Sequence, residues 1–401
     1  MTGGPSTPYS EGMPSPTSPS SGTRPHNLAR VLRLVHEEGA QSRAALTERT
    51  GLNRSTIADL VGELVRRGLV DERVPDVPGR VGRPSPVVTA SARVVAIAVN
   101  PEVDAIEIAA VGLDRSILVR ERLPNKSLPT PEAVAGVIAE RIAAWRADAL
   151  AAGRIEAVGI AVPGLVRASD GVVRNAPHLD WVDVPLAELV RAAADVTVVV
   201  DNDATLGAIA EHRYGAGRGI DDLVYLNGGA SGIGGGLIIR GFPVTGAGGY
   251  AGEFGQNRPR ITDDADRRTA DGVLEAEVSR RLLLDVAGLD QADDDTLDRE
   301  LTASDSSEVE AEVTRQAHVL ASALANAVNV LNPSVIVLGG FLATLADLQG
   351  ERLAADVAAL AMTESAEGVE IRPAALGADR LLIGAAELAF AELLADPGGH
   401  V

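Results

Sequence analysis

Residues 196–215 read VTVVVDNDATLGAIAEHRYG, and this stretch decides the fold class. Its β-branched start is typical of a buried strand, and the apolar spacing that follows predicts a helix with Leu206, Ile209 and Ala210 on one face. Asp203 is therefore expected where a strand ends and a helix begins, which is where ligands bind in open α/β sheets. Its carboxylate can accept a hydrogen bond or a proton from a ligand hydroxyl, whereas the simpler interpretation is that Asp203 only caps the helix.

The composition bounds the class of protein. The chain has 401 residues, of which 46% are hydrophobic but few are aromatic, so we expect two or three domains with an aliphatic core. No run approaches the ~20 apolar residues of a membrane span, and the amino terminus does not read as a signal peptide. The absence of Cys excludes disulfides and thiolate metal sites and fits a reducing compartment, so we expect a cytoplasmic protein with no membrane partner.

Charge is unevenly distributed along the chain. The formal net charge is −20, yet residues 24–83 hold eleven Arg and no Lys against eight acidic residues. A slightly basic module on a strongly acidic body predicts two different roles, with nucleic-acid contacts confined to the module. Residues 1–23 are rich in Ser, Pro, Thr and Gly and are predicted to be a disordered tail.

Residues 24–90 predict a winged helix-turn-helix. Helical periodicity begins at Asn27, Ser42 is placed to cap a second helix, and Gly51 makes the turn before a third. Strands at 68–73 and 86–89 enclose an Arg-bearing loop, which reads as a wing that enters a minor groove or as a plain solvated loop. The amino end of the last helix is expected to reach base edges, although a three-helix interaction module is the alternative. The predicted DNA-binding residues are Arg43, Asn53, Arg54, Ser55, Thr56, Arg80 and Arg83.

The body contains an internal repeat. A strand, turn, strand opening at 94–111 recurs at 223–240, with a glycine-rich turn expected at 228–236. Two such halves predict an α/β architecture of the actin and hexokinase type, with two lobes facing a cleft. We expect the first lobe at 91–200 and the second at 201–380, with an Ala- and Leu-rich helix at 381–395 packing back on the first.

An ordered set of motifs resembles the ROK family of repressors, open reading frames and kinases, specifically its winged-helix transcription regulators. Each motif alone is weak evidence, whereas the set in this order is specific. The motifs are NRST at 53–56, AVPG at 161–164, NDA at 202–204, SGIGGG at 231–236, GEFG at 252–255, LEA at 274–276, NP at 332–333, GG at 339–340 and IGAA at 383–386.

The resemblance implies a sugar site and an ATP site like those of the family's kinases. Matched by position, the sugar site comprises Gly164, Asn202, Asp203, Glu253, Gln256 and Glu275. In the kinases the position of Asp203 is the catalytic base. Carboxylates and amides suit a ring of sugar hydroxyls. Asn175 and His178 are further candidates, although a lone His before Trp181 reads equally well as structural.

Two departures from the kinase pattern predict that the chain is not an enzyme. The family's zinc site uses a His where Gln256 stands and three Cys in a segment that here, at 257–273, has neither Cys nor His, so no metal is expected. The first phosphate loop of the kinases reads Asp-x-Gly, but here Asn100 replaces the Asp and Glu102 the Gly. We therefore expect no ATP cofactor, because a carboxylate repels a triphosphate and Pro101 removes an amide donor.

These observations predict a sugar-responsive DNA-binding regulator, with repression the commoner role among relatives. The expected partners are double-stranded operator DNA, a sugar or sugar phosphate effector, and a second copy of the chain in a homodimer or tetramer. The expected location is the cytoplasm, in association with the nucleoid. Two alternatives are an active sugar kinase with an appended DNA module and a DNA-binding scaffold whose cleft binds nothing.

Overall fold

Three helices and a small antiparallel sheet form the amino-terminal head. The computed structural model describes residues 24–73, 86–167, 169–261 and 266–399. The Ser42 side chain accepts a hydrogen bond from the Ala45 amide, which caps the second helix as predicted, and Gly51 ends that helix with φ 70°. The elements are α1 (Arg24–Glu38), α2 (Arg43–Thr50), α3 (Arg54–Arg66), β1 (Gln41–Ser42), β2 (Val70–Arg73) and β3 (Val87–Ala90), with sheet order β1-β3-β2. The expected wing tip with Arg80 and Arg83 lies outside the described residues.

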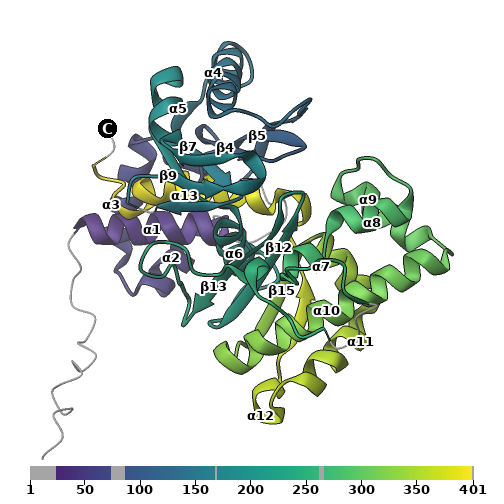
Figure 1. The fold of residues 1–401 in the computed structure, drawn as a ribbon. Helices are drawn as coiled ribbons and strands as arrows, with labels where there is room; N and C mark the ends of the chain where they lie inside the picture. Colours follow the sequence, from purple (N-terminus) through teal and green to yellow (C-terminus); the bar gives the residue numbers. More distant parts are fainter. Residues whose placement is uncertain (1–23, 74–85, 168, 262–265, 400–401) are drawn as a thin grey trace, which may run out of the picture.

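The first lobe is built on a five-stranded sheet of order β11-β7-β4-β5-β6. Its strands are β4 (Val94–Pro101), β5 (Ala105–Gly112), β6 (Ile117–Pro124), β7 (Arg154–Val162) and β11 (Val198–Asn202). Helices α4 (Pro131–Ala147) and α5 (Leu186–Ala194) cover one face (Figure 1). A small sheet of β8 (Leu165–Arg167), β9 (Val172–Ala176) and β10 (Trp181–Val184) extends from the end of β7.

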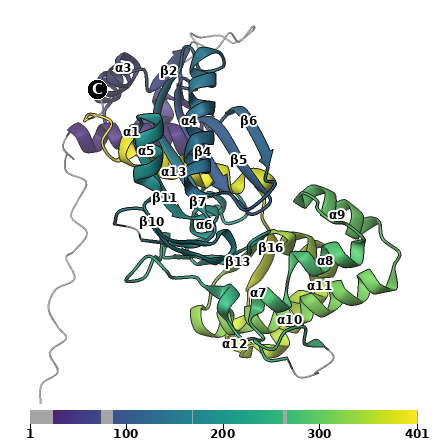
Figure 2. The same cartoon turned by 45° about the horizontal axis from the view of Figure 1, so that its top comes forward.

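The second lobe repeats the topology of the first. Its sheet order is β14-β13-β12-β15-β16, and in both lobes an antiparallel hairpin leads into two parallel strands. The strands are β12 (Leu223–Gly229), β13 (Gly232–Ile239), β14 (Phe242–Pro243), β15 (Val335–Gly340) and β16 (Glu370–Pro373). The helices are α7 (Leu274–Glu277), α8 (Arg280–Ala287), α9 (Asp294–Ala303), α10 (Ser307–Leu331), α11 (Phe341–Leu360) and α12 (Thr363–Ala366), gathered on the far side of this lobe (Figure 2). The predicted two-lobed α/β architecture is confirmed.

Two helices lie between the lobes. Helix α6 (Asp203–Tyr214) packs on β12 and β13, and α13 (Arg380–Ala395) packs on α6, β4 and β7. They approach closely because Gly384 of α13 faces the backbone carbonyl of Leu206 in α6, where a Cβ would collide. The helices therefore connect the lobes through direct backbone contact.

The head and the first lobe share one hydrophobic core. Leu32 of α1 and Leu64 of α3 belong to the same buried cluster as Ala98 of β4 and Phe390 of α13. Figure 1 shows α13 running alongside α1 behind the first lobe. The head is thus fixed on the body by packing, rather than attached through a flexible linker.

The expected glycine-rich turn at 228–236 is wrong in extent. Strand β12 continues to Gly229 and β13 begins at Gly232, so all six glycines of this stretch belong to the two strands. A Cβ on Gly234 or Gly236 would come within 2.7 Å of the α6 side chains Ala204 and Ala208. The glycines allow β13 to pack directly on α6. Among the described residues, none of the helices combines the length and apolarity that a membrane crossing requires.

Candidate functional site

The amino end of α3 presents the predicted DNA-reading residues. The Asn53 side chain caps the helix by accepting hydrogen bonds from the Thr56 amide at 2.8 Å and the Ser55 hydroxyl at 2.7 Å. Asn53, Arg54 and Ser55 are exposed and Thr56 is half-buried, while the opposite face of α3 is buried in the head. The local fold therefore leaves one polar helix end facing outward, as base readout requires.

Arg43 is held within the head. Its guanidinium forms a two-pronged ion pair with Glu72 of β2, with N···O distances of 2.6 and 2.7 Å. Such a pair fixes the side chain and neutralises its charge. The role of Arg43 in DNA binding stays a prediction, and it would require this pair to open or be shared with a phosphate.

The six predicted sugar-site residues come together in one pocket between the lobes. They arrive from the end of β7, the start of α6, the turn around Phe254 and α7. The pocket is lined by Pro163, Gly164, Pro177, His178, Asn202, Asp203, Asn227, Ser231, Gly232, Ile233, Gly234, Glu253, Gln256 and Glu275. His178, a further candidate, also lines it, whereas Asn175 is not among the lining residues and its backbone carbonyl packs against Gly164. Their role as sugar ligands stays a prediction.

Asn202 and Asp203 have different structural roles at the start of α6. Asn202 is the capping residue, because its Oδ1 accepts from the Thr205 amide at 2.9 Å. Its Nδ2 donates to the Gly164 carbonyl at 3.1 Å, which ties the helix to the end of β7. Asp203 begins the helix and its Oδ2 accepts from Asn227 Nδ2 at 3.2 Å. The alternative that Asp203 only caps α6 is therefore wrong, since its neighbour supplies the cap and Asp203 faces the pocket.

The pocket contains three carboxyl groups whose pKa values are shifted in different directions. Burial raises the pKa of Asp203 to about 6, against the hydrogen bonds from the Ala204 amide and Asn227. Burial also raises the pKa of Glu253, and Asp203 adds to the effect. The pKa of Glu275 is lowered although burial opposes this, because His178, the Ile233 amide and Gln256 favour its charged form. Glu275 is thus a fixed anion, while Asp203 is able to take up a proton near neutral pH.

Sequence reasoning missed the role of Asn227. This residue lies near the end of β12, the strand of the second lobe that corresponds to β4 in the first. Its Nδ2 donates to Asp203 and its Oδ1 accepts from Arg380 Nε at 3.0 Å. The position at a strand's carboxyl end was the available signal.

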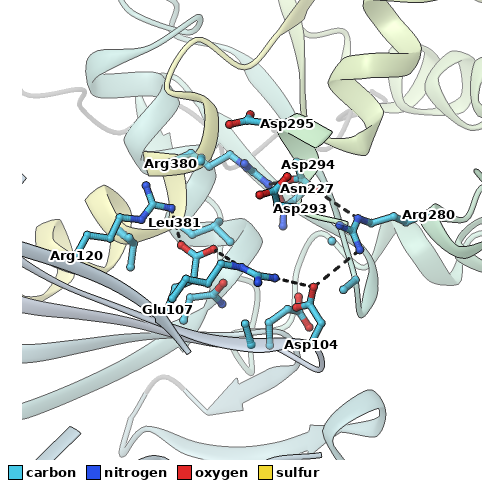
Figure 3. Close-up of a pocket in the computed structure, with 18 residues that line it drawn as sticks. Asp104, Glu107, Arg120, Asn227, Arg280, Asp293, Asp294, Asp295, Arg380 and Leu381 are labelled. Carbon is cyan, nitrogen blue, oxygen red and sulfur yellow. Dashed lines mark hydrogen bonds and ion pairs between the residues drawn. The ribbon is translucent and has the colours of Figure 1, made fainter. Parts of the chain in front are cut away.

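A second pocket of about 300 Å³ adjoins the first and shares Asn227 with it (Figure 3). Asn100, at the expected phosphate loop, is buried and donates to the Ala161 carbonyl at 2.9 Å. Glu102 turns inward and accepts from the Ser231 hydroxyl at 3.0 Å, bridging the two lobes. Burial raises its pKa to about 8, and Asp203 contributes to this rise.

The raised pKa of Glu102 shows that the expected electrostatic repulsion of a triphosphate is wrong. At neutral pH the Glu102 carboxyl is largely uncharged, so it does not repel a triphosphate as an anion would. It instead occupies space beside Gly229, where a Cβ would lie 3.0 Å from its Oε2. The obstruction at this position is steric.

Arg380 fills the other side of the second pocket. Its guanidinium is buried and lies against the Gly339–Gly340 pair, where added Cβ atoms would come within 3.1 Å of it. It is held by the Asn227 amide, the Gly377 carbonyl and Asp294. Arg280 pairs with Asp294 at 3.3 Å and with Asp104 at 4.0 Å, so alternating charges connect the second lobe to the first (Figure 3).

The profile of the ROK family matches residues 96–392, most of the chain. The chain belongs to the ROK family. It is 28% identical to the xylose repressor of Caldicellulosiruptor bescii over 82% of this chain and 86% of that protein. A solved ROK family transcriptional regulator, described as a homologue of the E. coli MLC protein, shares the fold over 93% of this chain and 97% of that one, with TM-score 0.72 and 20% identity.

An enzyme of the ROK family is also similar to this chain. The glucokinase of Streptomyces griseus, solved with glucose and AMPPNP, matches 74% of this chain and 99% of its own, with TM-score 0.59 and 26% identity. The match to the kinase thus leaves about a quarter of this chain uncovered, whereas the regulator is matched almost throughout.

Gln256 marks where this ROK protein departs from the family's zinc site. Its Nε2 donates to Glu275 Oε1 at 2.6 Å, so the amide is engaged with a carboxylate of the first pocket. Among the described residues, no three His, Asp or Glu side chains are grouped so that they could hold a metal ion. The absence of zinc stays a prediction.

Proposed function

We propose that this ROK protein is a DNA-binding transcriptional repressor whose affinity for operator DNA responds to a sugar in the pocket at Asp203. One observation carries the proposal: six residues, 111 positions apart at the extremes, converge on one pocket, while the polar end of α3 stays exposed. The similarity to a xylose repressor over 82% of this chain supports it.

The chemistry of the pocket favours a neutral sugar over a sugar phosphate. Its lining residues include three carboxyl groups and no Lys or Arg. A phosphate dianion placed there would meet at least one fixed anion, Glu275, and the one basic side chain of the lining, His178, is already paired with that carboxylate at 3.8 Å. Sugar hydroxyls, in contrast, both donate to carboxylates and accept from the Asn202 and Gln256 amides.

Phosphoryl transfer is disfavoured by the occupants of the second pocket. Glu102 fills the expected phosphate loop, and Arg380 covers the Gly339–Gly340 pair. Neither the Asp nor the open glycine backbone of the kinase loop is present to hold a metal-bound nucleotide. We therefore assign no ATP cofactor and no kinase activity to the chain.

The mode of DNA binding follows from the head. We propose that a homodimer places two α3 helices in successive major grooves of a near-palindromic operator. The body is strongly acidic, so contacts with the duplex are confined to the basic head, and binding should weaken steeply with salt.

The sugar arm of the test is thermal unfolding of the full chain with D-xylose, D-glucose and glucose 6-phosphate. A bound neutral sugar is expected to raise the unfolding temperature by mass action, and the phosphate ester is expected to have no effect. Asp203→Asn should abolish the rise, while Asp201→Asn, a neighbour outside the pocket lining, should keep it. A rise with glucose 6-phosphate alone would contradict the ligand class.

The DNA arm uses a gel shift with the DNA upstream of the protein's own gene, with and without each sugar. A change in apparent Kd on adding the sugar that raised the unfolding temperature is expected. DNA binding that ignores every sugar would instead support the scaffold alternative.

One observation favours the kinase alternative: a pocket of about 300 Å³ is lined by Asn227, which also lines the first pocket and donates a hydrogen bond to Asp203. Release of ADP from ATP in the presence of glucose or xylose measures it directly. Turnover that disappears in Asp203→Asn would restore an enzymatic function.

A further inference from the structure

Helix α6 reaches from the sugar pocket to the DNA-binding head. Asp203 at its first position lines the pocket, and Tyr214 at its last position lies beside His36 of α1. Its 12 residues span about 18 Å at 1.5 Å per residue. One rigid element therefore has its two ends in the two functional parts of the molecule.

A buried polar cluster occupies the head end of α6. We name it the α1–α6–α13 cluster and define it as His36, Arg213, Tyr214 and Glu387. The Tyr214 hydroxyl donates to Glu387 Oε1 at 2.9 Å and lies 3.2 Å from His36 Nε2. Arg213 pairs with the other Glu387 oxygen. Three side chains from α1 and α6 thus meet at the single carboxylate of Glu387 on α13.

The hydrogen bonds of His36 fix its protonation. Its Nδ1 lies 2.6 Å from the Leu113 carbonyl oxygen, and its Nε2 lies 2.8 Å from Glu387 Oε1. Both partners are acceptors, so both ring nitrogens must donate, and the ring is an imidazolium. Although burial alone would lower it, the pKa of His36 is raised by Glu387, whose own pKa falls to about 2 beside His36 and Arg213.

Charged groups from α13, α6 and the β5–β6 turn lie around this imidazolium. Glu387 comes from α13, Arg213 from α6 and Arg115 from the β5–β6 turn, where it stacks 4.3 Å above the Tyr214 ring. Glu37, on α1, adds a further negative charge near Arg213. His36 and Glu387 are both almost fully buried, so breaking their contact would leave a charge unpaired in the core.

We propose that α6 and the α1–α6–α13 cluster form the coupling element that transmits sugar occupancy to the head, with His36, Tyr214 and Glu387 as positioning residues. This rests on the proposed function. Sugar binding at Asp203 displaces the amino end of α6, and the helix carries the displacement to Tyr214. Because Tyr214 and His36 share Glu387, the displacement moves α1 and with it α3. Removing a single hydroxyl or proton from the cluster should therefore lower the coupling free energy between the pocket and the head.

The experiment measures coupling separately from binding at either end. Operator Kd is measured with and without D-xylose or D-glucose for the full-length wild type, Tyr214→Phe and His36→Gln. Tyr250→Phe, which removes a hydroxyl outside both the pocket lining and the cluster, is the matched control. The sugar-induced rise in unfolding temperature is recorded for all four proteins.

We expect wild type and Tyr250→Phe to show the same ratio of Kd with and without sugar. Tyr214→Phe and His36→Gln should keep the sugar-induced rise in unfolding temperature. Their ratio of operator Kd with and without sugar should be at least threefold closer to one than that of wild type. As an independent readout, NMR at pH 7.5 should show two protons on the His36 ring in wild type and one in Glu387→Gln.

Failure of this inference is distinguishable from failure of the proposed function. If the wild type responds to sugar and both variants respond equally, only the coupling element is overturned. If the wild type binds sugar without any change in operator Kd, the proposed function fails and the coupling fails with it. Loss of the sugar-induced rise in unfolding temperature in both variants would mean that the cluster stabilises the pocket itself, and this result would also overturn the coupling role.

Discussion

Glu102 shows how much a single buried carboxyl can govern stability. Its pKa of about 8 in the folded protein exceeds the ordinary 4.5, so the neutral form is the one that the fold favours. Stability from this group is complete below pH 4.5 and is lost as pH rises to 8, by at most about 5 kcal/mol and less where Asp203 shares the proton. Glu102→Gln keeps a partner for Ser231 without the titration. We expect it to unfold at a higher temperature than wild type at pH 8.5 and at the same temperature at pH 4.5, as followed by circular dichroism. Glu140→Gln, an exposed control, should show no such pH-dependent difference, and a wild-type advantage at pH 8.5 would contradict the assignment.

Helix α3 is the element on which the proposed DNA binding depends. Arg54 is exposed at its amino end and makes no side-chain hydrogen bond or ion pair with any described residue. Arg54→Ala is expected to weaken operator binding at least about fivefold, because a lost base or phosphate contact costs about 1–3 kcal/mol. Arg66→Ala, at the carboxyl end of the same helix, should change binding less than threefold. The sugar-induced rise in unfolding temperature should stay intact in both variants. Equal weakening by Arg54→Ala and Arg66→Ala would indicate non-specific attraction rather than readout by the helix end.

Asn53→Ala removes the helix cap and should lower the free energy of unfolding by about 1 kcal/mol, whereas Asn53→Ser should not.

The molecule as a whole behaves as one head-and-lobe unit joined to a second lobe. Phe390 of α13 is fully buried in the core that the head and the first lobe share. Phe390→Ala should therefore cost about 3–5 kcal/mol and destabilise both parts together. Hydrogen exchange should show lost protection in α1 and in β4 alike, while α10 and α11 of the second lobe keep theirs. Protection lost in only one of the two parts would mean that the head folds as an independent domain.

Much of the site could be predicted because topology repeats. The motifs at 161–164 and 202–204 lie at the carboxyl ends of two neighbouring strands of the first lobe, β7 and β11, whereas those at 252–255 and 274–276 lie in a turn and in helix α7 of the second lobe, and the two lobes bring all four to one pocket. The helix cap at Ser42 was equally local, since it needs only a Ser and an amide three residues on. Features that depend on short segments and on strand ends were therefore within reach of sequence reasoning.

The contacts made by α13 could not be predicted in the same way. Arg380 and Glu387 meet partners more than 150 positions away, Asn227 and Arg213, and no spacing rule relates such residues. The protonation of Glu102 was also hidden, because burial rather than residue type sets it. The glycines at 234–236 were predicted to form a turn. Sequence alone does not distinguish a glycine that forms a turn from a glycine that allows another element to pack closely against the backbone.

The shared core has a consequence for synthesis of the protein. Helix α13 follows every other described element in the chain, yet it packs on α1, and its Phe390 and Leu393 belong to the core that the head shares with the first lobe. A nascent chain still on the ribosome lacks these side chains until translation passes residue 393. We expect the head to acquire its final stability only after translation of α13, so unfinished polypeptides would not compete for the operator.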